Sequence, residues 1–409
     1  MTDYARIKEE NSRLADAECA QRRGIYQHYP EVLQIELTDR CNGRCIMCKH
    51  YYKGNHGTGD LAKGVLAKLE EYLPFCRLVL LNGYGESLIS SQYRSCMDLL
   101  KKYQVKAFVT SNLSVFTKEM EEDAQTVFEQ ISVSCHGSNK EDYERISQGL
   151  TFETFTKNLE RLSSLPGRPQ IALSVVAMAP NIAKAEEMVE FAAKYRVPEV
   201  RYGRLGINQF LDNGELDLIH YEEAARYYFG KAKERADALG IRLVYPENYH
   251  GAVSDSARLD EEIRRLETLP FRYTENYRSQ MEREYLRSAA EGSYEKEKQE
   301  PFSTGIACRG ICDWAGKGMY IDKNGFCYTC CETKEACYGR ISEDSLEEIR
   351  NGQTAQEVRR TFGAGELPYF CINCPFVINR ELKMLEVKAQ KKLYVSLDYK
   401  ASGKHTGQE

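Results

Sequence analysis

Several features that define other protein classes are scarce or missing in this sequence of 409 residues. It has no run of about 18 uncharged apolar residues, which a membrane-spanning helix would require. Residues 1–24 are charged and lack the apolar core of a secretory signal, so we expect a cytoplasmic protein. Basic residues do not exceed acidic ones, 56 against 61, which gives no support for nucleic-acid binding. We therefore expect no membrane and no nucleic-acid partner.

Cysteine, in contrast, is abundant, with 15 residues in the chain. A long chain without an export signal rarely uses such a set as a disulfide framework, and clustered cytosolic cysteines more often hold metal or perform redox chemistry. Three of them lie within residues 41–48, and eight lie within residues 308–374. The sequence therefore indicates two separate metal-binding regions.

Short apolar runs alternate with amphipathic helical patterns from residue 33 to residue 205, beginning with LQIEL and RLVLLN. This alternation is typical of βα units around a parallel sheet. Six such units favour a partial (β/α)6 TIM-like barrel over an open sheet, so the predicted fold class is α/β. A small cysteine-rich domain that binds metal is predicted to follow the barrel.

The length and the changes in composition predict several segments. They are an N-terminal helical segment (1–30), the partial barrel (31–212), a charged helical bridge (213–300), the cysteine-rich auxiliary domain (301–385) and a C-terminal tail (386–409). The bridge is interpreted as solvated helix rather than as a binding surface, and the end of the tail is expected to be disordered.

The loop after the first predicted strand contains Cys41, Cys45 and Cys48. In parallel barrels, the loops at the carboxyl ends of the strands form the active-site face. Structural zinc usually takes four ligands, and neither His50 nor His56 has the usual spacing for a fourth. Three thiolates instead suit a [4Fe–4S] cluster in which one iron stays open, and an open iron can bind a substrate or cofactor directly.

The spacing Cys41-x3-Cys45-x2-Cys48 after the first strand of a βα series resembles the cluster loop of the radical S-adenosylmethionine superfamily. Met47 differs from the aromatic residue that is common there. The resemblance implies that the open iron chelates S-adenosylmethionine and that the reduced cluster cleaves it. The 5′-deoxyadenosyl radical would then take a hydrogen atom from substrate. A flavodoxin- or ferredoxin-type protein would donate the electron.

NGYGES, after the second predicted strand, resembles the glycine-glutamate motif that lies beneath the cofactor's amino group in this superfamily. Gly83, Gly85 and Glu86 match the motif, Tyr84 lies between them, and Ser87 replaces the usual proline. Glycines at these positions would let backbone carbonyls approach an ammonium group closely. The resemblance implies that this segment binds the cofactor.

Asn112 and Ser134 follow the third and fourth predicted strands, where the superfamily often contacts the cofactor. A polar strand end that caps a helix explains both residues equally well. Arg145 matches an arginine of a family helix, although Ser147 departs from the pattern two positions later. The resemblance implies cofactor contacts for Asn112 and Ser134.

The catalytic acid and base stay unassigned. Cys135 follows the fourth predicted strand and is a candidate hydrogen donor, while Glu86 is a candidate acid–base group. Asp60, His136 and Tyr202 are further candidates near the barrel mouth, for which the sequence gives no geometry.

The second cysteine region is similar to the SPASM and twitch auxiliary-cluster modules of the same superfamily. Cys312, followed after twelve residues by Gly325-x4-Cys330, matches their start, and Cys371-x2-Cys374 matches their later CxxC. The resemblance implies one auxiliary [4Fe–4S] cluster with four thiolates and no open iron. The remaining thiols leave two alternatives open, a second auxiliary cluster and buried apolar packing: Cys308, Cys327, Cys331 and Cys337. Zinc is the alternative for this module taken alone.

The resemblance implies an oxidative enzyme whose auxiliary cluster accepts an electron from a substrate radical. Our first hypothesis is the oxidation of a small polar or carbohydrate-like substrate, because one-cluster twitch enzymes oxidise such a molecule. The first alternative is a maturase that introduces a cross-link, a thioether or an epimerised residue into a ribosomally made peptide. The second alternative is a non-catalytic iron–sulfur or zinc regulator.

Overall fold

The computed structural model describes residues 2–48, 59–205, 216–269, 303–307, 311–331 and 336–371. Some features singled out in the sequence lie outside these ranges: His50, His56, Cys308, Cys374 and the tail at 386–409. The part of the predicted bridge at 270–300 also lies outside the described residues.

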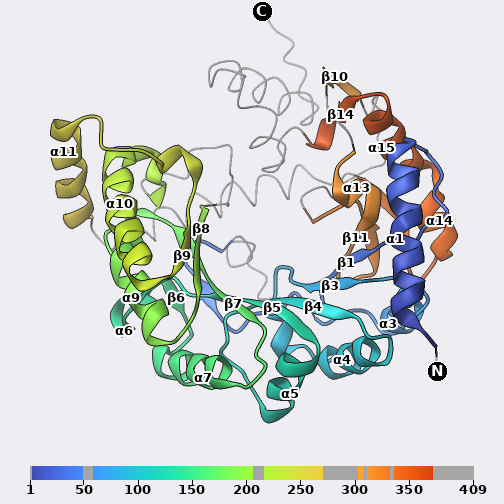
Figure 1. Cartoon of the computed structure of the whole chain (residues 1–409), viewed down its shortest axis with the longest axis horizontal. Helices are drawn as coiled ribbons and strands as arrows, with labels where there is room; N and C mark the ends of the chain where they lie inside the picture. Colours follow the sequence, from blue (N-terminus) through green and yellow to red (C-terminus); the bar gives the residue numbers. More distant parts are fainter. Residues whose placement is uncertain are drawn as a thin grey trace, which may run out of the picture.

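A ten-stranded sheet forms the centre of the molecule, in the order β13-β12-β11-β1-β3-β4-β5-β7-β8-β9 (Figure 1). Seven neighbouring strands run parallel: β1 (Val32–Ile35), β3 (Leu78–Leu81), β4 (Lys106–Ser111), β5 (Phe128–Ser134), β7 (Gln170–Ala177), β8 (Glu199–Arg204) and β9 (Arg242–Val244). The first six are the six predicted units, so the predicted partial barrel is confirmed. Strand β9 adds a further parallel strand within the predicted bridge.

Helices cover the outer side of the curved sheet, and its concave side faces the centre of the molecule (Figure 1). The helices that follow the strands are α3 (Val65–Leu69), α4 (Tyr93–Lys102), α5 (Lys118–Thr126), α6 (Lys140–Ile146), α7 (Phe152–Ser164), α8 (Ala179–Ile182), α9 (Ala185–Lys194), α10 (Glu222–Leu239) and α11 (Ser256–Glu267). Short 3-10 turns lie at η1 (Ser87–Ile89), η3 (Leu218–His220) and η4 (Glu247–Tyr249). No described helix is both long and apolar enough to cross a membrane.

Strand β7 illustrates how the sheet divides its two faces, because side chains alternate along a strand. Ile171, Leu173 and Val175 are almost fully buried in the hydrophobic core, whereas Ser174 and Val176 on the opposite face are partly exposed. The core therefore lies between the sheet and the helices. The concave face retains accessible surface.

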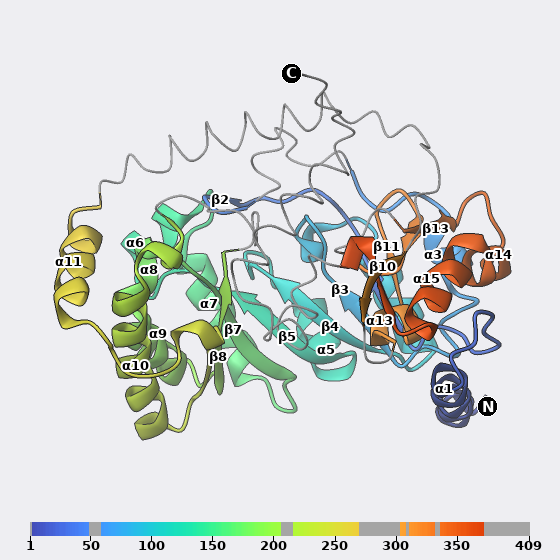
Figure 2. The same cartoon turned by 90° about the horizontal axis from the view of Figure 1, so that it is seen from above.

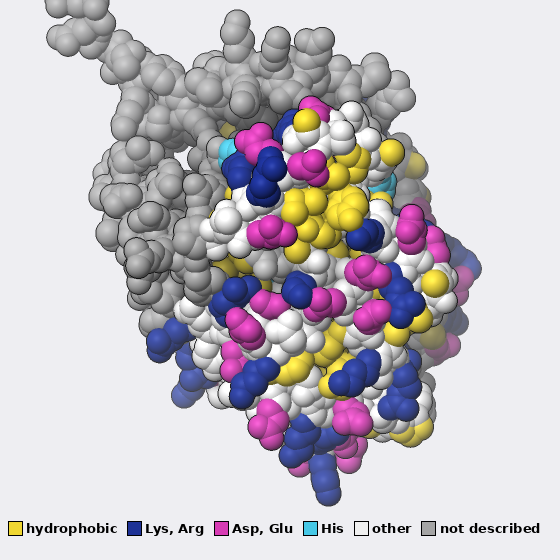
Figure 3. Space-filling model, turned by 90° about the vertical axis from the view of Figure 1, so that its left-hand side faces the viewer, with side chains coloured by type: hydrophobic (Ala, Val, Ile, Leu, Met, Phe, Trp, Pro, Cys, Tyr) yellow, Lys and Arg dark blue, Asp and Glu magenta, His cyan; other side chains and the backbone are white. Residues whose placement is uncertain are grey.

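The outward surface of α9, α10 and α11 mixes acidic and basic side chains around small apolar areas (Figure 3). Arg235 of α10 pairs with Glu190 of α9 at 2.8 Å, and Lys233 pairs with Asp237 along α10 at 2.5 Å. These exposed pairs contribute little to stability because water screens them. The helix layer is therefore held mainly by its buried apolar face.

The cysteine-rich region continues the barrel sheet. Strand β11 (Gly318–Ile321) pairs in parallel with β1, and β12 (Phe326–Tyr328) and β13 (Cys337–Arg340) follow as antiparallel strands. Gly325, in the turn between β11 and β12, has a φ of 83°, which glycine adopts without strain. The remaining elements are β10 (Ser303–Ala307), α13 (Asp313–Lys317), α14 (Leu346–Asn351), α15 (Gln353–Gly363), β14 (Glu366–Pro368) and the 3-10 turn η5 (Tyr369–Cys371).

Helix α1 (Tyr4–Ala20) lies beside the helices of the cysteine-rich region in both views of the chain (Figures 1 and 2). Asp3 caps its first turn by accepting the N–H of Arg6 at 3.1 Å. The N-terminal end of the described chain therefore packs against the region that carries the second group of cysteines, far away in sequence.

Candidate functional site

Two short strands fix the three-cysteine loop at the rim of the barrel. Cys45 lies in β2 (Arg44–Cys45), which pairs antiparallel with β6 (Ser147–Gln148) so that Cys45 faces Ser147. The N–H of Cys48 donates to the carbonyl of Cys45 at 3.0 Å. Ser147, which departs from the family pattern in sequence, thus contacts the cluster loop.

The three thiols of this loop are free, partly exposed and close enough to influence one another. Burial raises the pKa of Cys41 to about 11, and the neighbouring Cys48 adds to this shift. Burial also raises the pKa of Cys45 to about 12, with contributions from Cys48 and Cys41. Among the described residues, no group of three such side chains already lies close enough together to hold a metal ion, so the three thiols would have to converge around a cluster. Binding of iron would release their protons.

Hydrogen-bond donors point toward the sulfur of Cys41. The backbone N–H of Gly43 lies 3.4 Å from it, and Nδ2 of Asn112 lies 3.9 Å from it. Nδ2 of Asn112 also donates to Oδ1 of Asn42 at 3.0 Å, and Asn42 in turn donates to Ser114 at 2.7 Å. Donors of this kind stabilise the thiolate form that iron requires.

The glycine-glutamate segment packs directly against the start of the cysteine loop. A Cβ at Gly85 would lie 2.4 Å from the carbonyl oxygen of Thr38 and 2.5 Å from that of Arg40. A Cβ at Gly83 would lie 2.5 Å from Oε1 of Glu36, which accepts the N–H of Tyr84 at 2.7 Å. Neither position has room for a side chain, so the close approach of the two segments requires glycine.

Glu86 is a buried link between two strand ends. Its carboxylate accepts the backbone N–H of Asn112 at 2.6 Å and that of Leu88 at 3.2 Å. Burial raises the pKa of Glu86 above its ordinary value, and these hydrogen bonds oppose the shift. The contacts favour a positioning role for Glu86, since both oxygens are held by backbone donors rather than directed at a reacting group.

Ser134 lies in a polar row across the concave face. The register pairs Ser134 of β5 with Ser174 of β7, and Ser174 with Arg201 of β8. The Arg201 side chain is 40% exposed, and it forms an ion pair with Glu199 on the same face. Sequence patterns did not single out Ser174 or Arg201. Their signal was a polar residue among buried apolar neighbours: Ser174 lies between Leu173 and Val175, and Arg201 between Val200 and Tyr202.

Cys135 does not reach the concave face, which corrects the expectation that it lies with the active-site residues. It is fully buried on the opposite, helix-covered face, where its sulfur lies 3.9 Å from Sδ of Met188 in α9. Burial raises the pKa of Cys135 to about 12. Tyr202 is likewise a core residue, packed edge-to-face against Phe229 at 5.1 Å between ring centroids.

The other two acid–base candidates have defined partners. Nδ1 of His136 accepts the N–H of Val176 at 3.2 Å, and burial lowers the pKa of His136 to about 4, so the ring is neutral at pH 7. Asp60 takes three hydrogen bonds from Arg40, at 2.6, 2.7 and 3.2 Å, and one from the N–H of Ser91 at 3.0 Å. Burial alone would raise the pKa of Asp60, but these hydrogen bonds lower it below its ordinary range.

In the cysteine-rich region, the described thiols lie at the ends of regular elements. Cys312 is the N-cap of α13, Cys330 follows β12, and Cys371 ends η5. Cys330 and Cys371 both affect the pKa of Tyr338, which burial raises to about 12, so the two thiols flank one side chain. Cys327, in contrast, is fully buried in the core.

Comparison with protein-family models matches residues 312–375 to SPASM, an iron–sulfur cluster-binding domain. The cofactor-modifying protein of the tungsten-containing aldehyde ferredoxin oxidoreductase of Pyrococcus furiosus is 23% identical over 204 residues, 46% of this chain and 56% of that protein. The probable GTP 3′,8-cyclase of Thermococcus kodakarensis is 27% identical over 169 residues, 40% and 53% of the two chains. The chain thus spans about half the length of these curated relatives.

Two solved structures share the fold. Streptococcus suis SuiB bound to the precursor peptide SuiA has a TM-score of 0.54 at 12% identity, over 86% of this chain and 71% of SuiB. The structure of anSMEcpe with bound AdoMet also has a TM-score of 0.54, at 13% identity, over 90% of this chain and 96% of that one. The fold class is therefore a partial α/β barrel joined to a cysteine-rich iron–sulfur domain.

More particularly, residues 312–375 match a SPASM module, and the chain resembles radical S-adenosylmethionine proteins in its fold and in part of its sequence. The module matches the cysteine-rich region at 312–375, and the cysteine loop follows the first barrel strand as the sequence predicted. The predicted superfamily and its auxiliary module are thereby confirmed.

Proposed function

We propose that the protein is a radical S-adenosylmethionine enzyme that oxidises its substrate. Cys41, Cys45 and Cys48 would hold a [4Fe–4S] cluster, and the segment around Gly85 with Asn112 would hold S-adenosylmethionine. When bound, this pair supplies a 5′-deoxyadenosyl radical, which removes a hydrogen atom from substrate. The strongest support is that the three thiols of one loop influence one another's pKa, beside the tightly packed Gly85 and the amide of Asn112.

The protein side chains at this site would position the cluster and the cofactor, and would take no covalent part in the reaction. Glu86 holds the backbone of Asn112, and Asn112 directs its amide toward Cys41. Ser147 pairs with Cys45 and limits the movement of the loop. This fixed rim would keep the cluster and the cofactor in one orientation, which a reaction through a short-lived radical requires.

The auxiliary module would complete the oxidation. Cys312, Cys330, Cys371 and Cys374 would hold one [4Fe–4S] cluster, which supplies an acceptor for the second electron. For an alcohol substrate, loss of a hydrogen atom to the radical, then of one electron and one proton, leaves a carbonyl group. A flavodoxin- or ferredoxin-type protein would supply the electron that starts the reaction.

The polar row on the concave face supports a small polar or carbohydrate-like substrate. Ser134, Ser174 and Arg201 present two hydroxyl groups and a guanidinium group on one face. Such groups would bind hydroxyl or anionic groups of a substrate through hydrogen bonds. An apolar substrate would displace water from the two hydroxyl groups without replacing its hydrogen bonds, at a cost in binding free energy.

A second candidate is the maturation of a ribosomally made peptide. It is favoured by the fold neighbours, because SuiB is bound to a precursor peptide and anSMEcpe to the Cp18Cys peptide. Transfer of deuterium from a labelled substrate into 5′-deoxyadenosine would distinguish the two candidates. Label from a sugar alcohol supports the first, and label from a peptide Cα or Cβ position supports the second.

The activity itself can be tested without a known substrate. Protein reconstituted anaerobically with iron and sulfide is mixed with dithionite and S-adenosylmethionine, and 5′-deoxyadenosine is measured. We expect release by the parent protein and only background release by a Cys41→Ala, Cys45→Ala, Cys48→Ala triple variant. Equal release by both would overturn the proposal and favour the non-catalytic regulator.

A further inference from the structure

Arg201 of β8 lies on the polar side of the concave face, where a carboxylate holds one of its nitrogens. Nε of Arg201 donates to Oε1 of Glu199, which lies two residues earlier on the same face. Among the described residues, the two terminal nitrogens of this guanidinium group have no hydrogen-bond partner in the protein. Glu199 thus fixes the direction of the group, and the edge that binds carboxylate or phosphate oxygens in pairs stays free.

The charges around Arg201 do not balance. Nη1 of Arg242, on the neighbouring strand β9, lies 3.4 Å from Oε2 of Glu199, so two guanidinium groups share one carboxylate. The concave positions of the next two strands contain no acidic residue: Gln130, Ser132 and Ser134 in β5, and Gln170, Ala172, Ser174 and Val176 in β7. Two positive charges against one negative charge leave a net charge of +1 among the described residues of this side, which favours an anion.

The described residues leave space beside Arg201, toward the carboxyl ends of the strands. Gly203 lies two positions later on the same face of β8 and is exposed. No atom of the described chain lies within 4 Å of a Cβ placed at Gly203. Ser174, which is in register with Arg201 on β7, is partly exposed, and its hydroxyl has no hydrogen-bond partner among the described residues. A ligand therefore has room to reach the guanidinium group and this hydroxyl together.

Arg201 is distant from the cysteine loop along the sheet. Asn112, whose amide lies 3.9 Å from the sulfur of Cys41, directly follows β4. The next three strands are β5, β7 and β8, which carry Ser134, Ser174 and Arg201 in register. Neighbouring strands are about 4.8 Å apart, so β8 lies about 14 Å along the sheet from β4. A group bound at Arg201 would thus be remote from the end of the substrate at which a radical forms.

We propose that Arg201 determines the substrate class: the substrate carries an anionic group, a carboxylate or a phosphate, which the terminal nitrogens of Arg201 and the hydroxyl of Ser174 bind. This inference rests on the proposed function, because it takes the concave face as the side that binds substrate. An anion held far from the reacting carbon orients that carbon without taking part in the reaction. A neutral sugar would form hydrogen bonds here, but none between two charged groups.

The test measures binding, so it does not depend on turnover. The full chain is reconstituted anaerobically with iron and sulfide and is titrated by isothermal titration calorimetry with three probes: glucose 6-phosphate, gluconate and glucose. We expect at least one anionic probe to bind about tenfold more tightly than glucose. Tighter binding of glucose 6-phosphate assigns a phosphate group, and tighter binding of gluconate assigns a carboxylate. Equal binding of all three probes, or binding of none, overturns the inference.

Substitutions assign the bound anion to Arg201. Arg201→Gln should weaken binding of the anionic probe about tenfold, and Ser174→Ala about threefold. Arg201→Lys keeps the charge without the paired donors, so we expect an intermediate affinity. Arg235→Gln is the matched control, because Arg235 is also 40% exposed and paired with a glutamate, Glu190, but lies on the outer helices. Parent affinity in Arg201→Gln, or equal weakening in Arg235→Gln, overturns the inference.

The Cys41→Ala, Cys45→Ala, Cys48→Ala variant keeps this inference apart from the proposed function. The proposed anion site lies on the sheet, so this variant should bind the anionic probe with the parent affinity. Loss of binding in the variant would assign the anion to the cysteine loop and overturn the inference. A parent protein that binds the anion at Arg201 but releases no 5′-deoxyadenosine would overturn the proposed chemistry and leave the anion site established.

Discussion

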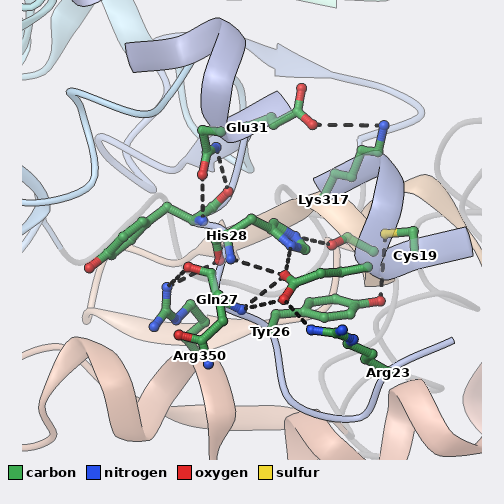
Figure 4. Close-up of polar contacts among 12 residues, drawn as sticks. Cys19, Arg23, Tyr26, Gln27, His28, Glu31, Lys317 and Arg350 are labelled. Carbon is green, nitrogen blue, oxygen red and sulfur yellow. Dashed lines mark hydrogen bonds and ion pairs between the residues drawn. The ribbon is translucent and has the colours of Figure 1, made fainter. Parts of the chain in front are cut away.

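The three-cysteine loop and the cysteine-rich region hold their thiols in different ways. In the loop, Cys41 lies in an irregular segment and Cys45 in the two-residue strand β2. They receive contacts from Asn112 and Ser147, which belong to other parts of the barrel. In the cysteine-rich region, Cys312 is the N-cap of helix α13, and the ring of His28 contacts the Gly316 carbonyl of the same helix (Figure 4). One set is held by the barrel rim, and the other by regular elements that extend the same sheet.

This difference suits the two proposed roles. A cluster that binds a cofactor must leave one iron accessible, so its ligands belong at an open rim. A cluster that only exchanges electrons needs four ligands and a stable reduction potential. Helices and strands fix the positions of the ligands and of the polar groups around them, which set that potential. We therefore expect the two regions to respond independently to substitution.

The largest expected effect is the loss of one of the two clusters, and so of half the bound iron, when either group of cysteines is substituted. The parent should bind about eight iron atoms for two cubane clusters. The Cys41→Ala, Cys45→Ala, Cys48→Ala variant and a Cys330→Ala, Cys371→Ala variant should each retain about four, because neither region supplies ligands to the other. Iron and sulfide analysis after anaerobic reconstitution checks this. Loss of all iron in either variant would show that the two sites are not independent.

The next effect concerns the rim alone. In Gly85→Ala, the added methyl group would collide with the carbonyl oxygens of Thr38 and Arg40, so we expect a loss of about 3 kcal/mol in the free energy of unfolding. Release of 5′-deoxyadenosine should fall with it, while auxiliary iron stays. Gly230→Ala is the control, since among the described residues no atom lies within 4 Å of its Cβ and alanine favours the helix. Equal stability of both variants would contradict close packing at the rim.

The sequence allowed the barrel and both cysteine groups to be predicted for physical reasons. The alternation of apolar and polar residues depends on which side chains a strand or helix buries, so it can be recognised within a short segment. The spacing of the cysteines depends on the geometry of the metal site that they form. The pairing of β11 with β1 was not predictable, because nothing in either short strand encodes so distant a partner. The contacts of His28 were missed for the same reason, since its partners Glu18 and Gly316 are brought together only by the fold.

Cys135 shows where local reasoning should have done better. Adjacent residues of a strand point to opposite faces, so Ser134 and Cys135 could not both face the cofactor. The structure buries the cysteine against Met188. Asn42 lies in a loop and Ser147 in a two-residue strand, so neither belongs to a periodic pattern, and only their contacts with Asn112 and Cys45 reveal them.

A smaller effect distinguishes one auxiliary cluster from two. Cys327 is fully buried and Cys337 lies near it on the next strand, so both are expected to be packing residues. Cys327→Ala with Cys337→Ala should leave the iron content unchanged and lower the free energy of unfolding by about 1 kcal/mol. A fall of about four iron atoms, or a parent content near twelve, would establish a second auxiliary cluster.

The smallest expected effect concerns the ion pair between Asp60 and Arg40 at the start of the cysteine loop. The hydrogen bonds of Asp60 with Arg40 and Ser91 hold its pKa below the value of about 3.9 expected in the unfolded chain. Such a group stabilises the fold above the unfolded pKa and loses that contribution as the pH falls toward the folded pKa. Asp60→Asn should therefore cost about 1 kcal/mol at pH 7, because Arg40 is half exposed, and less near pH 3. Urea unfolding at the two pH values measures the difference, and a cost that does not decrease on acidification would assign the contact to packing instead of charge.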